Sequence, residues 1–392
     1  MARDTKYLLI AMAVVMTLVF SVWNVLLNNF VVEKAAFTGQ EIGILQSLRE
    51  VPGFLAFTAI YLLLWFKEQT FALIFLALMC LGVAITGWFP TTYGLYMTTM
   101  VMSIGFHYFE TVNQSLTLQW VDKDESAAFM GKILAWKGAA SLLAYSAVWV
   151  LMEYFNISYN VVYMLFGLVG LIIVVGLWLY FPLFRQAHQQ HRKLILRKRY
   201  WLYYSLTFLS GARRQIFIVF AGFMMVEKFG YSVGEISLLF IINYIFNMLF
   251  AERIGRWIGK VGERKALTVE YIGLICVFTS YAFVENSYIA GGLYVIDHLF
   301  FALAIAIKTY FQKIAAPEDI ASTAGVSFTI NHITAVFIPA ILGVVWLTSP
   351  TFVFLFGSAL AASSLVLALL VPRKPSAGNE VFSTNKTAQD VT

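Results

Sequence analysis

The sequence predicts an all-α polytopic membrane protein with about twelve transmembrane helices in two six-helix, pseudo-symmetric halves. The chain is 60% hydrophobic and only 12% charged, whereas soluble domains are about 45–50% apolar and about 25% charged. Apolar runs of about 20 residues, long enough to cross about 30 Å of hydrocarbon, recur about twelve times. In addition, one short phrase of sequence appears once in each half.

The repeated phrase reads acid-acid-x-Ala-x-x-x-Gly. It begins at Asp124 and again at Glu318, an offset of 318 − 124 = 194 residues in a chain of 392. An internal repeat of half the chain length in a strongly apolar protein is typical of secondary transporters. The offset also gives a register between the halves, because the phrase stands at the start of the predicted fifth and eleventh helices.

The apolar runs give the elements in order, and the first is too long for a signal-peptide core. The predicted spans are residues 7–32, 41–66, 70–89, 93–119, 127–153, 158–181, 201–227, 234–253, 266–285, 288–314, 322–347 and 351–371. They predict four regions, namely an N-terminal six-helix bundle (1–181), a basic cytoplasmic linker (182–200), a C-terminal six-helix bundle (201–372) and a disordered cytoplasmic tail (373–392).

The orientation follows from the links between the spans. Lys and Arg gather in alternate links, including the run Arg185–Arg199 and the cluster Arg256–Lys265. Cytoplasmic loops collect such residues, so we expect both termini in the cytoplasm and the protein in the inner (cytoplasmic) membrane. The net charge of +6 is then a topology signal and no nucleic-acid partner is expected, whereas the linker fits contact with lipid headgroups. We expect a monomer.

One link carries a family motif. The segment Gly255–Leu267 resembles the cytoplasmic loop signature of the major facilitator superfamily, although Gly259 stands where an acidic residue is usual. The resemblance implies a twelve-helix transporter fold and a cytoplasmic gate motif formed by Gly255, Lys260, Gly262, Arg264 and Lys265. No metalloprotease, nucleophile-elbow or phosphate-loop motif is present, so we expect neither an enzyme nor a bound cofactor or metal.

Titratable residues in the middle of spans are expensive and usually functional. His107 and Glu110 share one face of the fourth span, and Asp297 and His298 are adjacent in the tenth. An imidazole beside a desolvated carboxyl titrates near neutral pH, so these four residues are predicted to carry protons. An inert pair that only holds helices together is the alternative.

Other polar residues within the spans are predicted to contact solute. Arg213 and Arg214 need anions near the membrane centre, supplied by Glu50, Glu110, Asp297 or the substrate. Arg49 and Glu50 point about 100° apart on a helix and are expected to find different partners. Lys308 meets an anion or extends toward cytoplasmic water. The remaining predicted contacts are Lys137, Gln114, Asn331, Asn24 and Asn28.

These residues favour proton-coupled transport of a small organic solute, anionic or zwitterionic, by alternating access, with a slight lean toward export. Two alternatives stay open. A divalent metal transporter would use His107, Glu110, Asp297, His298 and His332. Efflux of a lipid, amphipath or drug is the other, although the fifth span lacks the Gly-Pro-rich motif of many drug–proton antiporters.

Overall fold

The computed structural model describes residues 4–63, 65–121, 123–184, 196–316 and 319–382. These residues are almost entirely helical, and within them β pairing is limited to an isolated bridge between Ser376 and Asn379. The all-α prediction is confirmed. Two parts of the predicted regions lie outside the described residues. They are residues 185–195 of the predicted linker (182–200) and residues 383–392 of the predicted tail (373–392).

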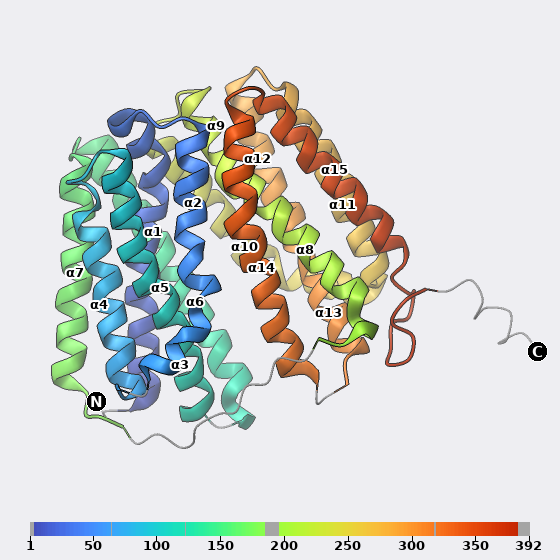
Figure 1. Ribbon diagram of the computed structural model, residues 1–392, viewed down its shortest axis with the longest axis horizontal. Helices are drawn as coiled ribbons and strands as arrows, with labels where there is room; N and C mark the ends of the chain where they lie inside the picture. The colour runs from blue at the N-terminus through green and yellow to red at the C-terminus, as the bar shows by residue number, and fades with distance from the viewer. Residues whose placement is uncertain (1–3, 64, 122, 185–195, 317–318, 383–392) are drawn as a thin grey trace, which may run out of the picture. The chain divides into compact units, whose positions relative to one another are not determined.

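The helices of the first half lie side by side in Figure 1, where α4 packs against both α5 and α7, and α1 packs against α6. A π-helical turn η2 (Val150–Tyr154) extends α6, and a 3₁₀ turn η1 (Ala56–Thr58) separates α2 from α3. The helices are α1 (Thr5–Ala35), α2 (Gly39–Phe54), α3 (Ala59–Leu62), α4 (Glu68–Thr86), α5 (Thr92–Trp120), α6 (Lys123–Trp149) and α7 (Tyr159–Tyr180).

Glycines allow close approach of α4 and α5. A Cβ atom on Gly105 would lie 2.3 Å from the backbone nitrogen of Met79, and one on Gly82 would lie 2.5 Å from that of Met102. Small residues at such contacts are how helices in membranes gain van der Waals packing. The helix α4 therefore packs closely against α5 and supports it.

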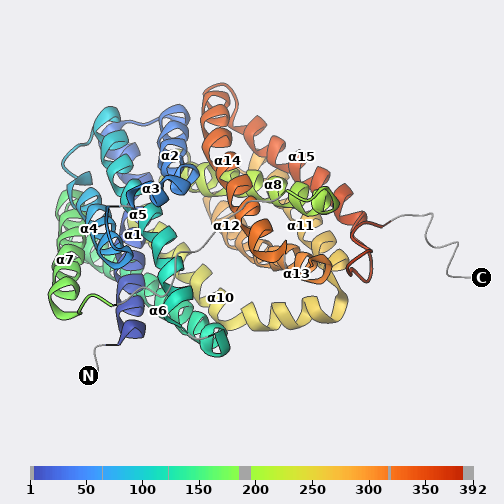
Figure 2. The ribbon, with the colours of Figure 1, turned by 60° about the horizontal axis from the view of Figure 1, so that its bottom comes forward.

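In the second half, α11 packs against α15 and α8 packs against α14 (Figure 2). Two of the predicted spans are interrupted, the seventh by the π-helical turn η4 (Ile216–Ala221) and the tenth by the 3₁₀ turn η5 (Ala302–Ala304). The elements are η3 (Lys198–Tyr200), α8 (Trp201–Gln215), α9 (Gly222–Glu227), α10 (Val233–Val261), α11 (Glu263–Phe283), α12 (Ser287–Phe301), α13 (Ile305–Ile314), α14 (Ile320–Trp346) and α15 (Pro350–Leu369).

The contacts divide the chain into two units. The first comprises Met1–Gln190 with Val226–Tyr244, and the second comprises His191–Met225 with Ile245–Thr392. The first unit thus includes the start of α10, which the sequence assigns to the second bundle. Hydrogen bonds explain this division: Asn29 Nδ2 donates to the Tyr231 carbonyl (2.6 Å), and the Gly234 N–H donates to Glu153 Oε1 (2.8 Å).

Ten helical segments within the described residues are long and apolar enough to cross a membrane. The two further predicted spans correspond to α2 with α3 and to α5, which carry Arg49, Glu50, His107 and Glu110. The helix α2 is only 16 residues long, and polar residues lower the hydropathy of α5, so the structure is consistent with about twelve spans. The second predicted span breaks at Phe54, directly after Pro52 and Gly53.

Candidate functional site

The most deeply buried charges lie together in the second unit. Arg213 on α8, Glu270 on α11 and Asp297 on α12 are each 0% exposed. Arg213 Nη2 lies 3.8 Å from Glu270 Oε1, which is within ion-pair distance but too long for a hydrogen bond. Both Arg213 and Asp297 act electrostatically on Glu270. We call these three residues the acid–arginine cluster.

Aromatic rings enclose the acid–arginine cluster. The Arg213 guanidinium carbon lies 4.5 Å from the ring centre of Tyr271, a cation–π geometry. Tyr294 interacts electrostatically with the Asp297 carboxylate. Its ring packs on Phe217, with ring centres 4.8 Å apart. A wall of this kind keeps the surroundings weakly polar, so that the charges interact strongly.

The acid–arginine cluster holds more acid than base. Two carboxyl groups face one guanidinium, and none of their four oxygens has a hydrogen-bond partner among the described residues. The Arg213 Nε donates to the Leu209 carbonyl of its own helix, at 3.3 Å. Burying an unmatched charge is costly, so this arrangement favours binding of one positive charge.

Irregular helix turns flank two of these residues. The π-helical turn η4 starts three residues after Arg213, and the 3₁₀ turn η5 starts five residues after Asp297. Such turns within helices frequently occur at functional sites and hinges. The helices that carry the acid–arginine cluster are therefore interrupted next to it.

Arg49 and Glu50 in the first unit pair with each other. Arg49 Nη2 and Nε donate to Glu50 Oε1 at 2.6 and 3.1 Å, and both side chains are largely buried. The expectation that they find different partners is wrong, because the long arginine side chain reaches back across the 100° between the two positions. Ser103 on α5 also donates a hydrogen bond to the Arg49 carbonyl.

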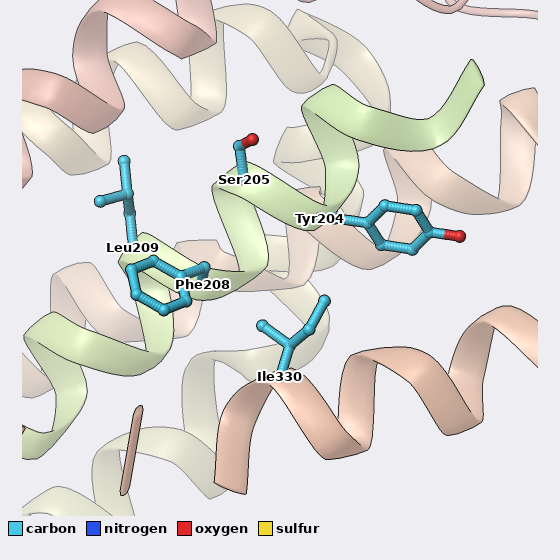
Figure 3. Close-up of a pocket in the computed structure, with 5 residues that line it drawn as sticks. All are labelled: Tyr204, Ser205, Phe208, Leu209 and Ile330. Atoms are coloured by element: carbon cyan, nitrogen blue, oxygen red, sulfur yellow. The ribbon is translucent and has the colours of Figure 1, made fainter. Parts of the chain in front are cut away.

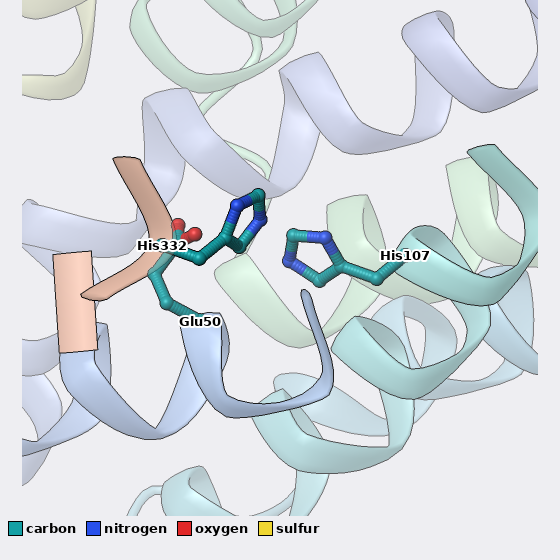
Figure 4. A group of neighbouring side chains, drawn as sticks. All are labelled: Glu50, His107 and His332. Carbon is teal, nitrogen blue, oxygen red and sulfur yellow. The ribbon is translucent and has the colours of Figure 1, made fainter. Parts of the chain in front are cut away.

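Glu110 pairs with Lys137 of α6, at 3.3 Å between Oε1 and Nζ, and both side chains are partly exposed. His107, which the sequence places beside Glu110, has a different acidic neighbour. A carboxylate oxygen of Glu50 lies within 4.8 Å of a ring nitrogen of His107 (Figure 4). An acid from α2 therefore lies beside this histidine, which helical spacing within α5 does not predict.

Asp297 and His298 are adjacent in sequence but have separate surroundings. His298 Nε2 forms a 2.8 Å hydrogen bond with Asn247 Nδ2 of α10, whereas Asp297 belongs to the acid–arginine cluster. The structure thus does not bring this acid and imidazole together as a pair.

The other predicted contacts fall into accessible and buried sets. Asn28 is buried and Asn24 half-buried on α1, and His332 is buried on α14. The signature residues Gly255, Lys260, Gly262, Arg264 and Lys265 lie at the junction of α10 and α11, where Gly262 has a φ of 85° that favours glycine. The exposed side chains are Gln114, Arg214, Lys308 and Asn331.

Each unit contains a cavity. In the second unit, a cavity of about 420 Å³ lies between α8 and α14 (Figure 3), lined by Tyr204, Ser205, Phe208, Leu209 and Ile330. In the first unit, a cavity of about 520 Å³ lies at the end of α1, lined in part by Glu33, Lys34, Asn156, Tyr159 and Asn160. Both volumes are in the range of small-molecule sites.

Glu270 was absent from the residues predicted by sequence. It lies only five residues into the predicted ninth span, so a search for charges near mid-membrane does not select it. The helix begins earlier, at Glu263, and places Glu270 about 10 Å from that end, at 1.5 Å per residue. A simpler rule selects Glu270, because an acid at any depth of an apolar span needs a partner.

The fold and the buried charges are those of a membrane transporter, and sequence comparison gives its family. Residues 7–339 match the sequence profile of the Major Facilitator Superfamily. The chain therefore belongs to the major facilitator superfamily, whose members are transporters and not enzymes. It is a multi-pass integral membrane protein.

A relative and several solved structures are similar to the chain. The uncharacterized MFS-type transporter MJ1317 of Methanocaldococcus jannaschii is 30% identical over 136 residues, so the match spans only 34% of either chain. A point mutant of the nucleoside transporter NupG superposes with a TM-score of 0.77 at 16% identity, covering 93% of this chain and 99% of that one. A POT family transporter in complex with 5-aminolevulinic acid gives 0.71 at 12% identity, covering 93% and 95%.

Proposed function

We propose that this chain is a proton-coupled secondary transporter in which the acid–arginine cluster carries the proton. The observation that supports the proposal is the charge count, since two fully buried carboxyl groups share one guanidinium. A proton on one of the acids makes the cluster neutral. The cost of burying an unmatched charge in the membrane then disappears.

Asp297 is the better candidate for the proton. Glu270 already lies within ion-pair distance of Arg213, so it benefits more from staying ionised. Release of the proton from Asp297 leaves a net negative charge in a site walled by Tyr271 and Tyr294. In that deprotonated state, a conformation that admits water or solute to the site becomes more favourable. Because protonation changes the relative stability of the two conformations, it is coupled to the conformational change.

The accessible polar side chains favour a solute with charged groups of both signs. The first unit presents the partly exposed Lys137–Glu110 pair, and the second presents Arg214 and Lys308. Arg213 no longer belongs among the solute contacts, because it is buried with two acids. A zwitterionic or anionic organic solute fits these groups, and a structurally similar POT family transporter was solved with the amino acid 5-aminolevulinic acid.

Divalent metal transport has less support. The acid and imidazole proposed as ligands in the tenth span have separate partners, since His298 bonds to Asn247 and Asp297 faces Arg213. Neighbouring guanidinium groups also oppose binding of a dication at both residues.

The orientation is part of the same proposal. The Lys and Arg residues in alternate links support a topology with both termini in the cytoplasm and the protein in the cytoplasmic membrane. We also propose that it is a monomer. Assays with the pH gradient in either direction decide between import and export.

Infrared difference spectroscopy of the purified protein, between acidic and alkaline buffer, tests the proton site without knowledge of the solute. We expect a band from a protonated carboxyl group that is lost in Asp297→Asn and kept in Glu110→Gln. Loss of the band in Glu110→Gln instead would move the proton site to the first unit. A spectrum with no such band in the wild type would overturn proton coupling at the acid–arginine cluster.

A further inference from the structure

The chain folds back on itself after α15. Pro372 and Pro375 are buried, although Pro375 belongs to the tail that the sequence predicts to be disordered. Asn379 Nδ2 donates to the Lys374 carbonyl at 2.9 Å, and the Phe382 N–H donates to the Leu370 carbonyl at 2.7 Å. The second bond closes a loop against the end of α15. We call residues 371–382 the C-terminal strap.

The C-terminal strap is bonded to two further helices. Tyr310, which is 0% exposed near the end of α13, donates its hydroxyl to the Glu380 carbonyl at 2.5 Å. The Arg264 guanidinium, in the first turn of α11, lies 5.2 Å from the ring centre of Phe382. The strap therefore connects α11, α13 and α15 at the same end of the second unit.

The helix α13 is the segment that the strap restrains most directly. It is only ten residues long and is separated from α12 by the 3₁₀ turn η5. A 3₁₀ stretch inside a longer helix marks a hinge. Beside the strap, Lys313 Nζ of α13 pairs with the buried Glu263 Oε1 of α11 at 2.5 Å, so both contacts oppose motion of α13 away from α11.

These restraints act next to the candidate site. Asp297 stands on α12, on the other side of η5 from α13, and Glu270 stands on α11, two turns from Glu263. Arg264 also belongs to the loop signature, and the strap occupies one face of its guanidinium through Phe382. A strap at this position can control how freely the end of the second unit rearranges.

We infer that the C-terminal strap is a conformational brake, which holds α13 against α11 and α15. Displacement of α13 about η5 requires release of the bond from Tyr310 to Glu380. The inference rests on the chain being a transporter that must change conformation and is independent of proton coupling.

Hydrogen–deuterium exchange of the full-length protein in detergent micelles tests the brake. Two variants weaken it, a chain terminated after Pro372 and Tyr310→Phe, which removes one hydroxyl. A chain terminated after Phe382 keeps the strap and is the matched control. We expect the amides of residues 305–314 to exchange about 2- to 10-fold faster in Tyr310→Phe, the range for one lost hydrogen bond, at least as fast in the Pro372 truncation, and at the wild-type rate in the control.

The helix α7 of the first unit supplies an internal reference, because it has no part in the strap. If truncation also speeds exchange in α7, the truncated protein is globally destabilised. The exchange rates of Tyr310→Phe then test the brake by themselves. Wild-type exchange of residues 305–314 in Tyr310→Phe, with α7 also unchanged, would show that the strap does not restrain α13.

Discussion

The two halves place different residues at the same three buried positions. Subtracting the 194-residue offset takes Arg213 to Val19 (213 − 194), Glu270 to Leu76 (270 − 194) and Asp297 to Ser103 (297 − 194). All six are 0% exposed. The first half fills these positions with neutral side chains, so the repeated fold does not need charges there. The three charges are therefore a feature of the second half alone, which supports the role proposed for the acid–arginine cluster.

The two buried or partly buried ion pairs of the first half each balance their charges, unlike the acid–arginine cluster. Arg49 pairs with Glu50, and Lys137 pairs with Glu110. Each pair contains one acid and one base, whereas the cluster contains two acids and one base. We propose that the unbalanced, fully buried cluster takes up a cation, and a proton is the smallest.

Of the changes that test this difference between the halves, we expect removal of Arg213 to have the largest effect on stability. Arg213→Met leaves two acids without a cation, and removing one partner of a buried ion pair costs about 3–5 kcal/mol. We expect a large loss of thermal stability at neutral pH, measured in detergent. The loss should shrink in acidic buffer, where protonation neutralises both carboxyl groups.

Neutralising the whole cluster is the control for this prediction. The triple variant Arg213→Met, Glu270→Gln, Asp297→Asn should recover most of the lost stability at neutral pH, and acidic buffer should not rescue it as it rescues Arg213→Met. A single Arg213→Met variant that unfolds at the wild-type temperature would show that Arg213 does not balance the acids.

Much of the fold and part of the site were predictable from sequence. The family and the all-α fold followed from apolar length, the repeated phrase and the loop at Gly255, and these are confirmed. Such features are local or periodic in the sequence, so one chain is enough to read them.

Partnerships between side chains were harder to predict. Glu110 was expected beside His107 on its own helix, but it pairs with Lys137 of α6. Helical spacing gives the face on which a residue lies and does not give the neighbouring helix. Arg49 shows a second limit, because its reach to Glu50 depends on side-chain length and rotamer rather than on backbone angle.

For the Lys137–Glu110 pair of the first half we expect a smaller effect on stability. Its side chains are 25% and 42% exposed, so solvent screens the interaction. In a double-mutant cycle with Lys137→Met and Glu110→Gln, we expect a coupling of at most about 1 kcal/mol, measured by thermal unfolding. A coupling as large as the loss in Arg213→Met would place this pair in the same class as the acid–arginine cluster.

The smallest expected effect concerns an acid whose oxygens are all satisfied, in contrast to those of Asp297. Asp319, from the second copy of the repeated phrase, accepts hydrogen bonds from Arg197 Nε (2.9 Å), Arg199 Nη2 (2.6 Å) and Tyr200 Oη (2.9 Å). Burial alone would raise the pKa of Asp319, but the hydrogen bonds from Arg199, Arg197 and Tyr200 hold that pKa below its ordinary value.

A lowered pKa means that folding favours the ionised form of Asp319. Its contribution to stability is present above the ordinary aspartate pKa and is lost as the pH falls through the folded-state pKa. Wild type should therefore unfold at a higher temperature than Asp319→Asn in neutral buffer, and the difference should vanish in strong acid. The effect is small because Arg197 and Arg199 are about half exposed (47% and 43%), and added salt should reduce it. A difference that grows as the pH falls would contradict this role for Asp319.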